Sequence, residues 1–277
     1  MQAQVDPDTR KQWSEEQQQI KSKILEKDCL PDQLRFIAGV DISFSKKHSD
    51  IAVSTVSLVN KENKTIGHMS SIEKINIPYV PGFLAFREVN TILSLICKID
   101  EELEAIDKEN QIDLVFVDGN GILHPNECGL ASHLGVLCDK PTIGCAKKIF
   151  AIDGLNRHKV DEIKQKFKGL GEQIASEYLK GNSGRIWGVA LKNTAKSYDP
   201  LIVSIGNKIS IDTAVDLTKR FSVTRVVQPV KLADKLSRQL INQFESFYNK
   251  NKNKLSEAEL ISEFQTIIDK KHNYLKL

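Results

Sequence analysis

Three acidic residues of this chain lie where a globular protein rarely places an unpaired charge. Asp41 stands inside the apolar stretch IAGVDISF, Glu88 shares a ridge of a predicted helix with apolar neighbours, and Asp118 ends the apolar run DLVFVD. A carboxylate in such surroundings is costly unless a cation compensates its charge. Carboxylate oxygens suit Mg²⁺ or Mn²⁺, and such an ion can activate water for phosphodiester cleavage. The three acids are therefore candidate metal ligands and catalytic residues.

Each acid on its own also has an ordinary explanation. An aspartate in a strand is more often capped or salt-bridged than bound to a metal, and a charged residue on a helix is usually solvated. The second explanation applies most directly to Asp234, the candidate for a fourth ligand, although Leu232, Ala233 and Leu236 surround it in the sequence. The joint placement of the acids on separate predicted elements is what favours a shared site.

Hydrophobic periodicity predicts the elements that must position these acids. The first part of the chain is expected to form a helix at 8–27, strands at 35–44, 50–59 and 65–77, a helix at 82–107 and a strand at 113–118. The rest is expected to form a helical segment at 128–138, a strand at 141–146, a partly helical region at 153–184, a hairpin of strands 186–192 and 201–206, and helices at 210–220, 230–249 and from Ser256. Short polar loops predict that the first three strands form an antiparallel meander, and continuous apolar runs predict central strands buried on both faces.

This order of elements is typical of a ribonuclease-H-like fold, an α/β fold with helices on both sides of a mixed central sheet. Three antiparallel strands are followed by parallel ones, and ligand sites gather beyond the carboxyl ends of such strands. Carboxylates on the first strand, the first helix and a later central strand would converge there. We expect a helical extension at 1–30, the ribonuclease-H-like domain at 31–249 and a helical tail at 250–277, with the polar run NKNKN at 249–253 as the joint.

The composition limits the other classes of protein. With 277 residues, 40% of them hydrophobic and 27% charged, the chain suits one α/β domain with extensions. A net charge of +3 is too mild to indicate nucleic-acid binding by itself. Five cysteines without a C-x-x-C pair argue against a disulfide framework and a zinc site. The polar N-terminus and the lack of an apolar run near the ~20 residues of a membrane span predict no membrane partner, and we expect a monomer in the cytoplasm, the nucleus or both.

Four segments of the sequence resemble one family. They are AGVDISF (38–44), PYVPGFLAFRE (78–88), VDGNGILHP (117–125) and IGCAKK (143–148), and they resemble endonuclease V in content, order and spacing. The similarity runs from about residue 34 to 245, and the second and third segments together are highly specific. The resemblance implies an endonuclease that uses Mg²⁺ or Mn²⁺ to cut the second phosphodiester bond on the 3′ side of inosine.

The resemblance also assigns roles to single residues. It implies that the metal-binding acids are Asp41, Glu88 and Asp118, that the late acidic position is Asp234, that the catalytic-site lysine is Lys147 and that the active-site histidine is His124. The Lys147 ammonium could reach the scissile phosphate and offset transition-state charge, and His124 could orient phosphate or water. The alternatives are a surface lysine, as we expect for Lys148, and a satisfied loop histidine.

A rigid segment is expected beside the modified base. Pro78, Tyr79, Val80 and Pro81 form the PYVP motif, whose two prolines fix their backbone angles and present the tyrosine at a strand-to-helix corner. The resemblance implies a wedge, because an aromatic ring can replace the stacking that a flipped base loses. A turn with a core tyrosine is the alternative. The resemblance alone also puts four residues around the inosine: Leu84, Gly119, Leu130 and Gly144.

Competing functions stay open at this point. Animal-like relatives favour inosine in RNA and read the 2′-hydroxyl near the cut; Asp234 and the DGNGILHP form favour this type over the bacterial relatives that repair deoxyinosine in DNA. An inosine-binding module that has lost catalysis is disfavoured, because the expected acids and Lys147 are present. A dinucleotide-binding protein, suggested by GNG at 119–121, lacks the third glycine and the immediate helix of that fingerprint.

Overall fold

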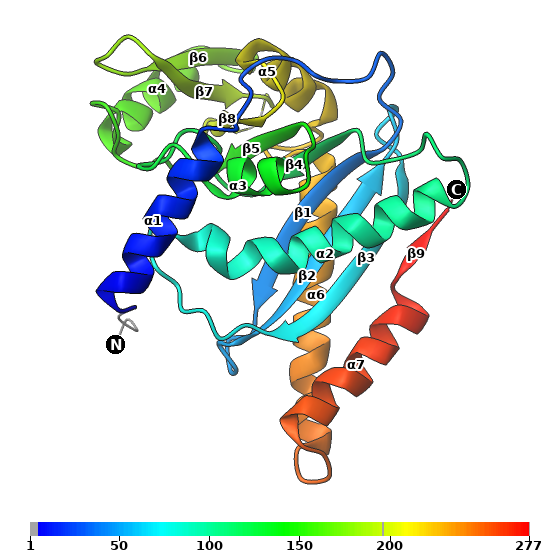
Figure 1. The fold of residues 1–277 in the computed structure, drawn as a ribbon. Coiled ribbons are helices and arrows are strands. Elements are labelled where there is room, and N and C mark those ends of the chain that lie inside the picture. The colour runs from blue at the N-terminus through cyan, green and yellow to red at the C-terminus, as the bar shows by residue number, and fades with distance from the viewer. Residues whose placement is uncertain (1–4, 196, 277) are drawn as a thin grey trace.

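The computed structural model describes residues 5–195 and 197–276, which form one nine-stranded sheet flanked by helices (Figure 1). The strands are β1 (Ile37–Phe44), β2 (Ile51–Val59), β3 (Thr65–Lys74), β4 (Leu114–Val117), β5 (Thr142–Ala146), β6 (Ala175–Lys180), β7 (Ile186–Lys192), β8 (Leu201–Asn207) and β9 (Tyr274–Leu275). The helices are α1 (Pro7–Lys21), α2 (Leu84–Glu104), α3 (Leu130–Leu137), α4 (Arg157–Gly169), α5 (Ile211–Phe221), α6 (Gln228–Asn251) and α7 (Glu257–Lys271). The strands lie in the order β6-β7-β8-β5-β4-β1-β2-β3-β9.

The directions of neighbouring strands divide the sheet into three parts. β1, β2 and β3 form an antiparallel meander, whereas β1, β4 and β5 run parallel to one another. β5, β8, β7 and β6 then alternate in direction. The predicted mixed sheet of an α/β, ribonuclease-H-like fold is therefore confirmed, and so is the predicted hairpin of β7 and β8.

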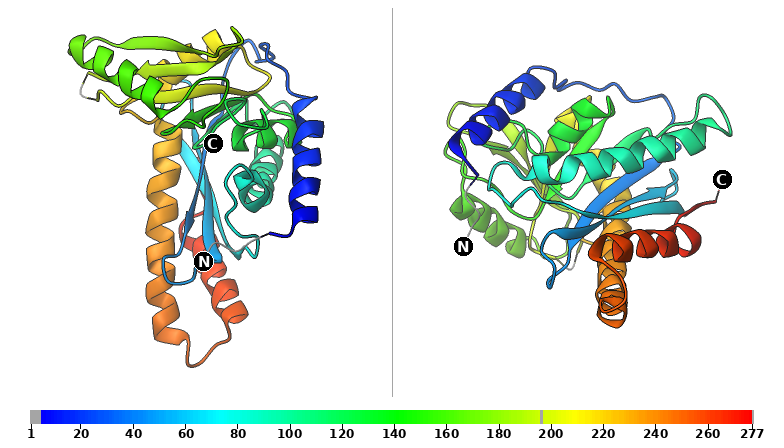
Figure 2. Two further views of the ribbon diagram at one scale, coloured as in Figure 1. Left: turned by 90° about the vertical axis from the view of Figure 1, so that its left-hand side faces the viewer. Right: turned by 60° about the horizontal axis from the view of Figure 1, so that its bottom comes forward.

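Helices cover both faces of the central strands (Figure 2). Val40 of β1 belongs to the core under α2 and α3, whereas Ile37 belongs to the core under α5 and α6. The helix layer that contains α6 approaches β1 very closely at Gly39, because a Cβ there would lie 2.2 Å from the carbonyl carbon of Pro229 in α6. The glycine thus lets α6 lie directly against the strand that carries Asp41.

The N-terminal helix is shorter than predicted. α1 ends at Lys21 rather than near residue 27, and the chain continues toward β1 without helical structure. The backbone N–H of Leu25 donates to Oδ1 of Asn207, and that of Cys29 donates to the carbonyl of Lys208. These tertiary hydrogen bonds replace helical ones, an effect that local periodicity cannot reveal.

The sequence does not predict the two edge strands. β6 lies in the region expected to be partly helical and partly loop, of which α4 forms the helical part. Only Leu179 of β6 is buried, so the apolar alternation that marks a half-buried strand is weak. β9 has two residues, too few to produce a periodic pattern.

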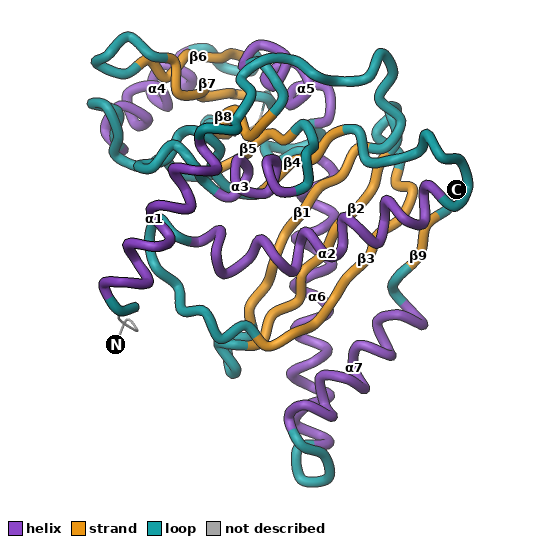
Figure 3. The backbone as a smooth tube through the Cα atoms, viewed as in Figure 1, coloured by secondary structure: helices purple, strands orange, loops and turns teal. Residues whose placement is uncertain are grey.

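The C-terminal helices form part of the hydrophobic core. α6 extends to Asn251, and a short loop then turns the chain into α7 (Figure 3). Leu260, Phe264 and Ile268 of α7 pack with Phe244 of α6 and with apolar residues of β2 and β3. The expected C-terminal tail thus packs against α6, β2 and β3, whereas the N-terminal helix α1 packs against α3. None of the helices in the described part of the chain combines the length and the apolar character needed to cross a bilayer.

Candidate active site

The sheet is interrupted beside Asp41. β1 pairs with β4 as far as Val40 and Val117, and β4 ends there, whereas β1 continues to Phe44. Asp118, which follows the last residue of β4, therefore lies beside Asp41. The early end of β4 leaves room for side chains that come from helices on both faces of the sheet.

The three predicted acids line one cavity at this interruption, which we call the acidic cavity. Its volume is about 260 Å³, and Asp41, Glu88 and Asp118 share its wall with apolar side chains. The apolar members are Val40, Ile42, Leu84, Ile92 and Leu130. The structure thus brings together acids from β1, α2 and the end of β4.

Asp41 is held by α6. The fully buried Ser237 donates from its hydroxyl to Oδ2 of Asp41 at 2.6 Å. Burial raises the pKa of Asp41 to about 7 against the opposing effect of this hydrogen bond, and the charges of Asp234 and Asp118 raise it further. Only Lys147 among the nearby charges lowers it. The carboxylate is therefore short of positive charge.

Glu88 is the most deeply buried of the three acids, with 7% exposure. Burial raises its pKa to about 8, and the charges of Asp41 and Asp118 add to the rise, while Arg87 opposes it. A buried carboxyl among like charges is stabilised in its ionised form only by added positive charge. The acidic cavity therefore favours a cation.

Asp118 has a cationic partner of its own. Nζ of Lys147 lies 2.6 Å from Oδ2 of Asp118, and the two residues follow the neighbouring parallel strands β5 and β4. The lysine side chain is 44% exposed, so its ammonium stays accessible from solvent. Lys148, expected to be a surface residue, is also exposed.

The predicted fourth acid lies on α6 beside the acidic cavity and does not line it. Oδ1 of Asp234 is 2.6 Å from Arg238, and the charge of Asp234 acts on Asp41. In the described residues, no three His, Cys, Asp or Glu side chains already surround one point as metal ligands. Asp118 and Asp234 instead each form an ion pair, with Lys147 and Arg238 respectively.

A smaller cavity of about 110 Å³, which we call the side cavity, adjoins the acidic cavity. Leu84 and Leu130 line both, so these two leucines form the boundary between the spaces. Tyr79, 53% exposed, and Gly119 also line the side cavity. The other lining residues are Gln17, Gly82, Ala85, Asn120, His124, Cys128, Gly129 and Phe150.

Gly144, expected near the base, does not line the side cavity. It lies in β5, where a Cβ would be 2.7 Å from the carbonyl oxygen of Gly119. Gly144 thus contacts the loop after β4 closely through its backbone, and its expected position beside the inosine stays a prediction. The rest of the PYVP motif flanks Tyr79 outside the cavity, with Val80 buried beneath the segment.

His124 lines the side cavity and not the acidic one. Its Nδ1 accepts from the backbone N–H of Asn126, and its ring stands edge-on to Phe150 with centroids 5.0 Å apart. Burial lowers the pKa of His124 to about 4, so the ring is neutral near pH 7. The expected contact of His124 with phosphate or water stays a prediction.

Sequence reasoning misses three residues at these cavities. Ser237 holds Asp41, while Gln17 and Asn120 line the side cavity. Oδ1 of Asn120 is buried and has no hydrogen-bond partner among the described residues. Ser237 could have been found, because it stands one helical turn after Asp234. Gln17 could not, because its partners lie 65 and 111 positions away in the sequence.

The fold and the acids together define the class of protein. A ribonuclease-H-like sheet with acids from β1, α2 and the end of β4 around one cavity is the arrangement of a ribonuclease-H-like nuclease. A dinucleotide-binding protein is disfavoured, because a loop at 118–129 and not a helix follows β4. The family model for endonuclease V matches residues 18–235, and the chain belongs to the endonuclease V family.

Individual relatives agree with this assignment. The chain is 36% identical over 239 residues to Endonuclease V of Homo sapiens, covering 83% of either chain, and to that of Mus musculus, covering 83% of this chain and 69% of the relative. The crystal structure of the catalytic domain of human Endonuclease V has a TM-score of 0.79 at 33% identity, covering 86% of this chain and 98% of that one. Ciona intestinalis Endonuclease V in complex with a 24mer DNA containing an inosine followed by a ribo-adenosine has a TM-score of 0.77 at 28% identity, covering 86% and 99%. The chain is therefore an endonuclease.

Proposed function

We propose that this chain is a metal-dependent endonuclease that cuts single-stranded nucleic acid, in particular RNA, at the second phosphodiester bond on the 3′ side of inosine. The observation that carries the proposal is the pair of adjoining cavities. Asp41, Glu88 and Asp118 line one of them, and Leu84 and Leu130 divide it from the other. Cleavage at a fixed distance from a recognised base needs two such neighbouring spaces.

The acidic cavity suits a hard divalent cation such as Mg²⁺ or Mn²⁺. Its donors are carboxylate oxygens, and the raised pKa values of about 7 for Asp41 and about 8 for Glu88 indicate carboxyls that lack compensating charge. These two and Asp118 would hold the ion, and rotation of Asp234 away from Arg238 would add a fourth ligand. When bound, the cation would activate water and offset negative charge on the phosphate.

Lys147 has the position of an electrostatic group for this reaction. Its ammonium is paired with Asp118 and open to solvent, so it can turn to a phosphate oxygen while it stays beside a candidate metal ligand. A fixed positive charge there would stabilise the transition state more than the ground state. Ser237 would keep the Asp41 carboxylate oriented through its hydrogen bond.

The side cavity supplies a basis for selecting hypoxanthine, the base of inosine. Hypoxanthine presents an N1–H donor, whereas adenine presents an unprotonated N1 and an amino group. Asn120 lines this cavity and its buried Oδ1 has no partner among the described residues, so a turn of its amide toward the base would offer N1–H an acceptor. Adenine would leave this buried acceptor unpaired, which costs about 1–3 kcal/mol. The exposed ring of Tyr79 at the rim can stack in place of a flipped base.

Two points support a preference for RNA. Asp234 and the DGNGILHP segment have the form that we expect of animal-like members. The Ciona intestinalis relative binds a strand in which a ribonucleotide follows the inosine, and a 2′-hydroxyl near the cut is a group that distinguishes RNA from DNA. Cleavage at deoxyinosine in DNA is the second candidate, because the remainder of that strand is DNA.

One assay tests the proposal. Single-stranded oligonucleotides carry inosine or adenosine at one position, with ribose or deoxyribose in the next nucleotide, and are incubated with the protein in Mg²⁺, Mn²⁺ or EDTA. We expect cleavage of the inosine strands only, faster with ribose, and no cleavage in EDTA or by Asp41→Asn. Equal cleavage of adenosine strands would refute inosine recognition. Binding without cleavage by the parent protein would indicate an inosine-binding module. Equal rates with ribose and deoxyribose would refute the preference for RNA, and faster cleavage with deoxyribose would favour DNA.

A further inference from the structure

Gln17 is a buried polar residue of α1, with 1% exposure, and its side chain ties two loops together. Its Nε2 donates to the carbonyl oxygens of Gly82 and Cys128, each at 3.0 Å. Its Oε1 accepts from Nδ2 of Asn126 at 2.7 Å. Both N–H donors and the oxygen of one amide thus have partners on loops that are remote from α1 in the sequence.

These two loops form walls of the side cavity. The loop between β3 and α2 contributes Tyr79 and Gly82, and the loop between β4 and α3 contributes Gly119, Asn120 and His124. Gln17 itself lines the same cavity and does not line the acidic one. The distance between the two walls therefore depends on a side chain that has no contact with the acidic cavity.

Docking of α1 does not by itself require this amide. Trp13 stacks on Phe86 of α2 with ring centroids 5.0 Å apart and an interplanar angle of 11°, and Ile20 is buried in the same helix. An apolar residue would dock a helix at lower cost than a buried amide, which must be fully hydrogen-bonded to be tolerated. The three hydrogen bonds of Gln17 therefore point to a positional role.

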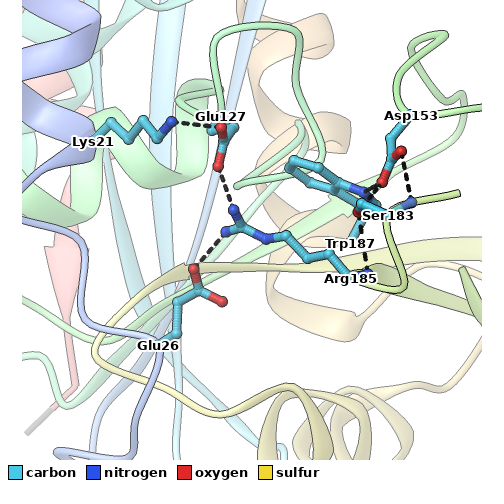
Figure 4. A network of polar contacts seen from close by, with 7 residues as sticks. All are labelled: Lys21, Glu26, Glu127, Asp153, Ser183, Arg185 and Trp187. Carbon is cyan, nitrogen blue, oxygen red and sulfur yellow. Dashed lines mark hydrogen bonds and ion pairs between the residues drawn. The ribbon is translucent and has the colours of Figure 1, made fainter. Parts of the chain in front are cut away.

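A network of ion pairs also holds the loop after β4. It begins at Lys21, one helical turn after Gln17 in α1. Lys21 pairs with Glu127, and Glu127 also pairs with Arg185 of the segment leading into β7. Arg185 also forms an ion pair with Glu26, with 2.6 Å between nitrogen and oxygen (Figure 4). The end of α1 and the segment that follows it therefore both contact this network. The loop is thus held at two successive places, by Gln17 and by Glu127.

We propose that Gln17 is a positioning residue for base selection, because its amide sets the spacing of the two loops and hence the fit of the side cavity to hypoxanthine. The inference rests on the proposed function. Without the amide, the carbonyl of Cys128 is left as a buried acceptor and the carbonyl of Gly82 loses one of its donors, so the loops separate or admit water. Asn120, the acceptor proposed for N1–H, lies in one of these loops and moves with it.

The test uses variants that separate hydrogen bonding from packing. Gln17→Met keeps the length of the side chain and its apolar contacts but removes both donors and the acceptor. Gln17→Glu keeps an acceptor for Asn126 and removes the donors to the two carbonyls. Gln18→Met is the matched control, because Gln18 is the next residue of the same helix and is exposed.

The measurement is kcat/KM in Mn²⁺ for RNA strands that carry inosine or adenosine at one position, together with Tm. At temperatures well below their Tm, we expect both Gln17 variants to lower kcat/KM for the inosine strand by about 10- to 100-fold. The ratio of kcat/KM for the inosine strand to kcat/KM for the adenosine strand should fall as well. Gln18→Met keeps the parent ratio. A parent-like ratio in Gln17→Met overturns the inference while the proposed function stands. A parent protein without preference for inosine overturns the proposed function and this inference with it.

Discussion

Nζ of Lys147 lies 2.6 Å from Oδ2 of Asp118, so the residue after β5 pairs with the residue after β4 where the sheet is interrupted. Among the residues that the structure describes, no Lys, Arg or His side chain lies at that distance from Asp41 or Glu88, and burial above all raises their pKa values to about 7 and about 8. One lysine thus faces several carboxylates. This imbalance links the proposed chemistry to the stability of the protein, and both can be measured.

Lys147→Met should slow cleavage without preventing substrate binding. The variant keeps the aliphatic stem and loses the ammonium, and loss of one preorganised group that stabilises transition-state charge costs about 100- to 1000-fold in rate. Single-turnover cleavage and equilibrium binding of an inosine strand would be measured separately. Lys148→Met is the matched control, since Lys148 is adjacent and exposed. An equal loss in both variants would argue against a specific role for Lys147.

Asn120→Ala should weaken selection of inosine. The variant removes the buried Oδ1 that has no partner among the described residues, and a hydrogen bond of this kind contributes about 0.5–1.5 kcal/mol, or roughly 10-fold in kcat/KM at the upper end. Competition between inosine and adenosine strands directly measures the ratio of their kcat/KM values. Asn90→Ala, at an exposed position of α2, should behave as the parent. An unchanged ratio in Asn120→Ala would remove this residue from base recognition.

Tyr79→Ala should weaken binding of inosine strands, whereas Tyr79→Phe should not. The ring is 53% exposed at the rim of the side cavity, and stacking of a base on an aromatic side chain is worth about 1–3 kcal/mol. Phenylalanine keeps the stacking face and loses only the hydroxyl. Fluorescence anisotropy with the inactive Asp41→Asn background would give both affinities. Loss in both variants would mean that the hydroxyl, and not the ring, makes the contact.

A residue of the site could be predicted where the sequence around it carries the signal by itself. Asp41, Glu88 and Asp118 were predictable because each interrupts an apolar pattern of its own element, and the order of elements then implied that they converge. The edge strand β6 was not, because its one buried residue, Leu179, leaves no alternation to detect. The convergence itself depends on the early end of β4, which the sequence places only to within a residue or two.

Contacts between remote segments account for most of what the sequence could not supply. His124 belongs to a recognisable motif, yet its burial beside Phe150 and its lowered pKa arise from the packing of two loops. Gln17 is one of three consecutive glutamines, and only the fold distinguishes it from the exposed Gln18 and Gln19. A side chain whose partners are distant leaves no periodic trace near its own position.

Glu88→Gln should stabilise the protein in EDTA, and the gain should grow with pH. The carboxyl has a reference pKa of 4.5 and a folded-state pKa raised to about 8. Between these values the unfolded chain has lost the proton and the folded protein still holds it, so the parent loses stability as pH rises from 4.5 to 8. Glutamine has no proton to lose. We expect the two proteins to have similar Tm values near pH 4.5, and the variant to be more stable by about 0.5–2 kcal/mol near pH 8.

Thermal unfolding from pH 4.5 to 8, with and without Mg²⁺, would measure this difference. Mg²⁺ should raise the Tm of the parent more than that of Glu88→Gln, because a ligand that binds only the folded state stabilises it by mass action and the variant has lost one donor. Glu101→Gln, at an exposed position of the same helix, should follow the parent throughout. A gain that is constant with pH would mean that glutamine improves packing, and a gain that shrinks toward pH 8 would contradict the raised pKa of Glu88.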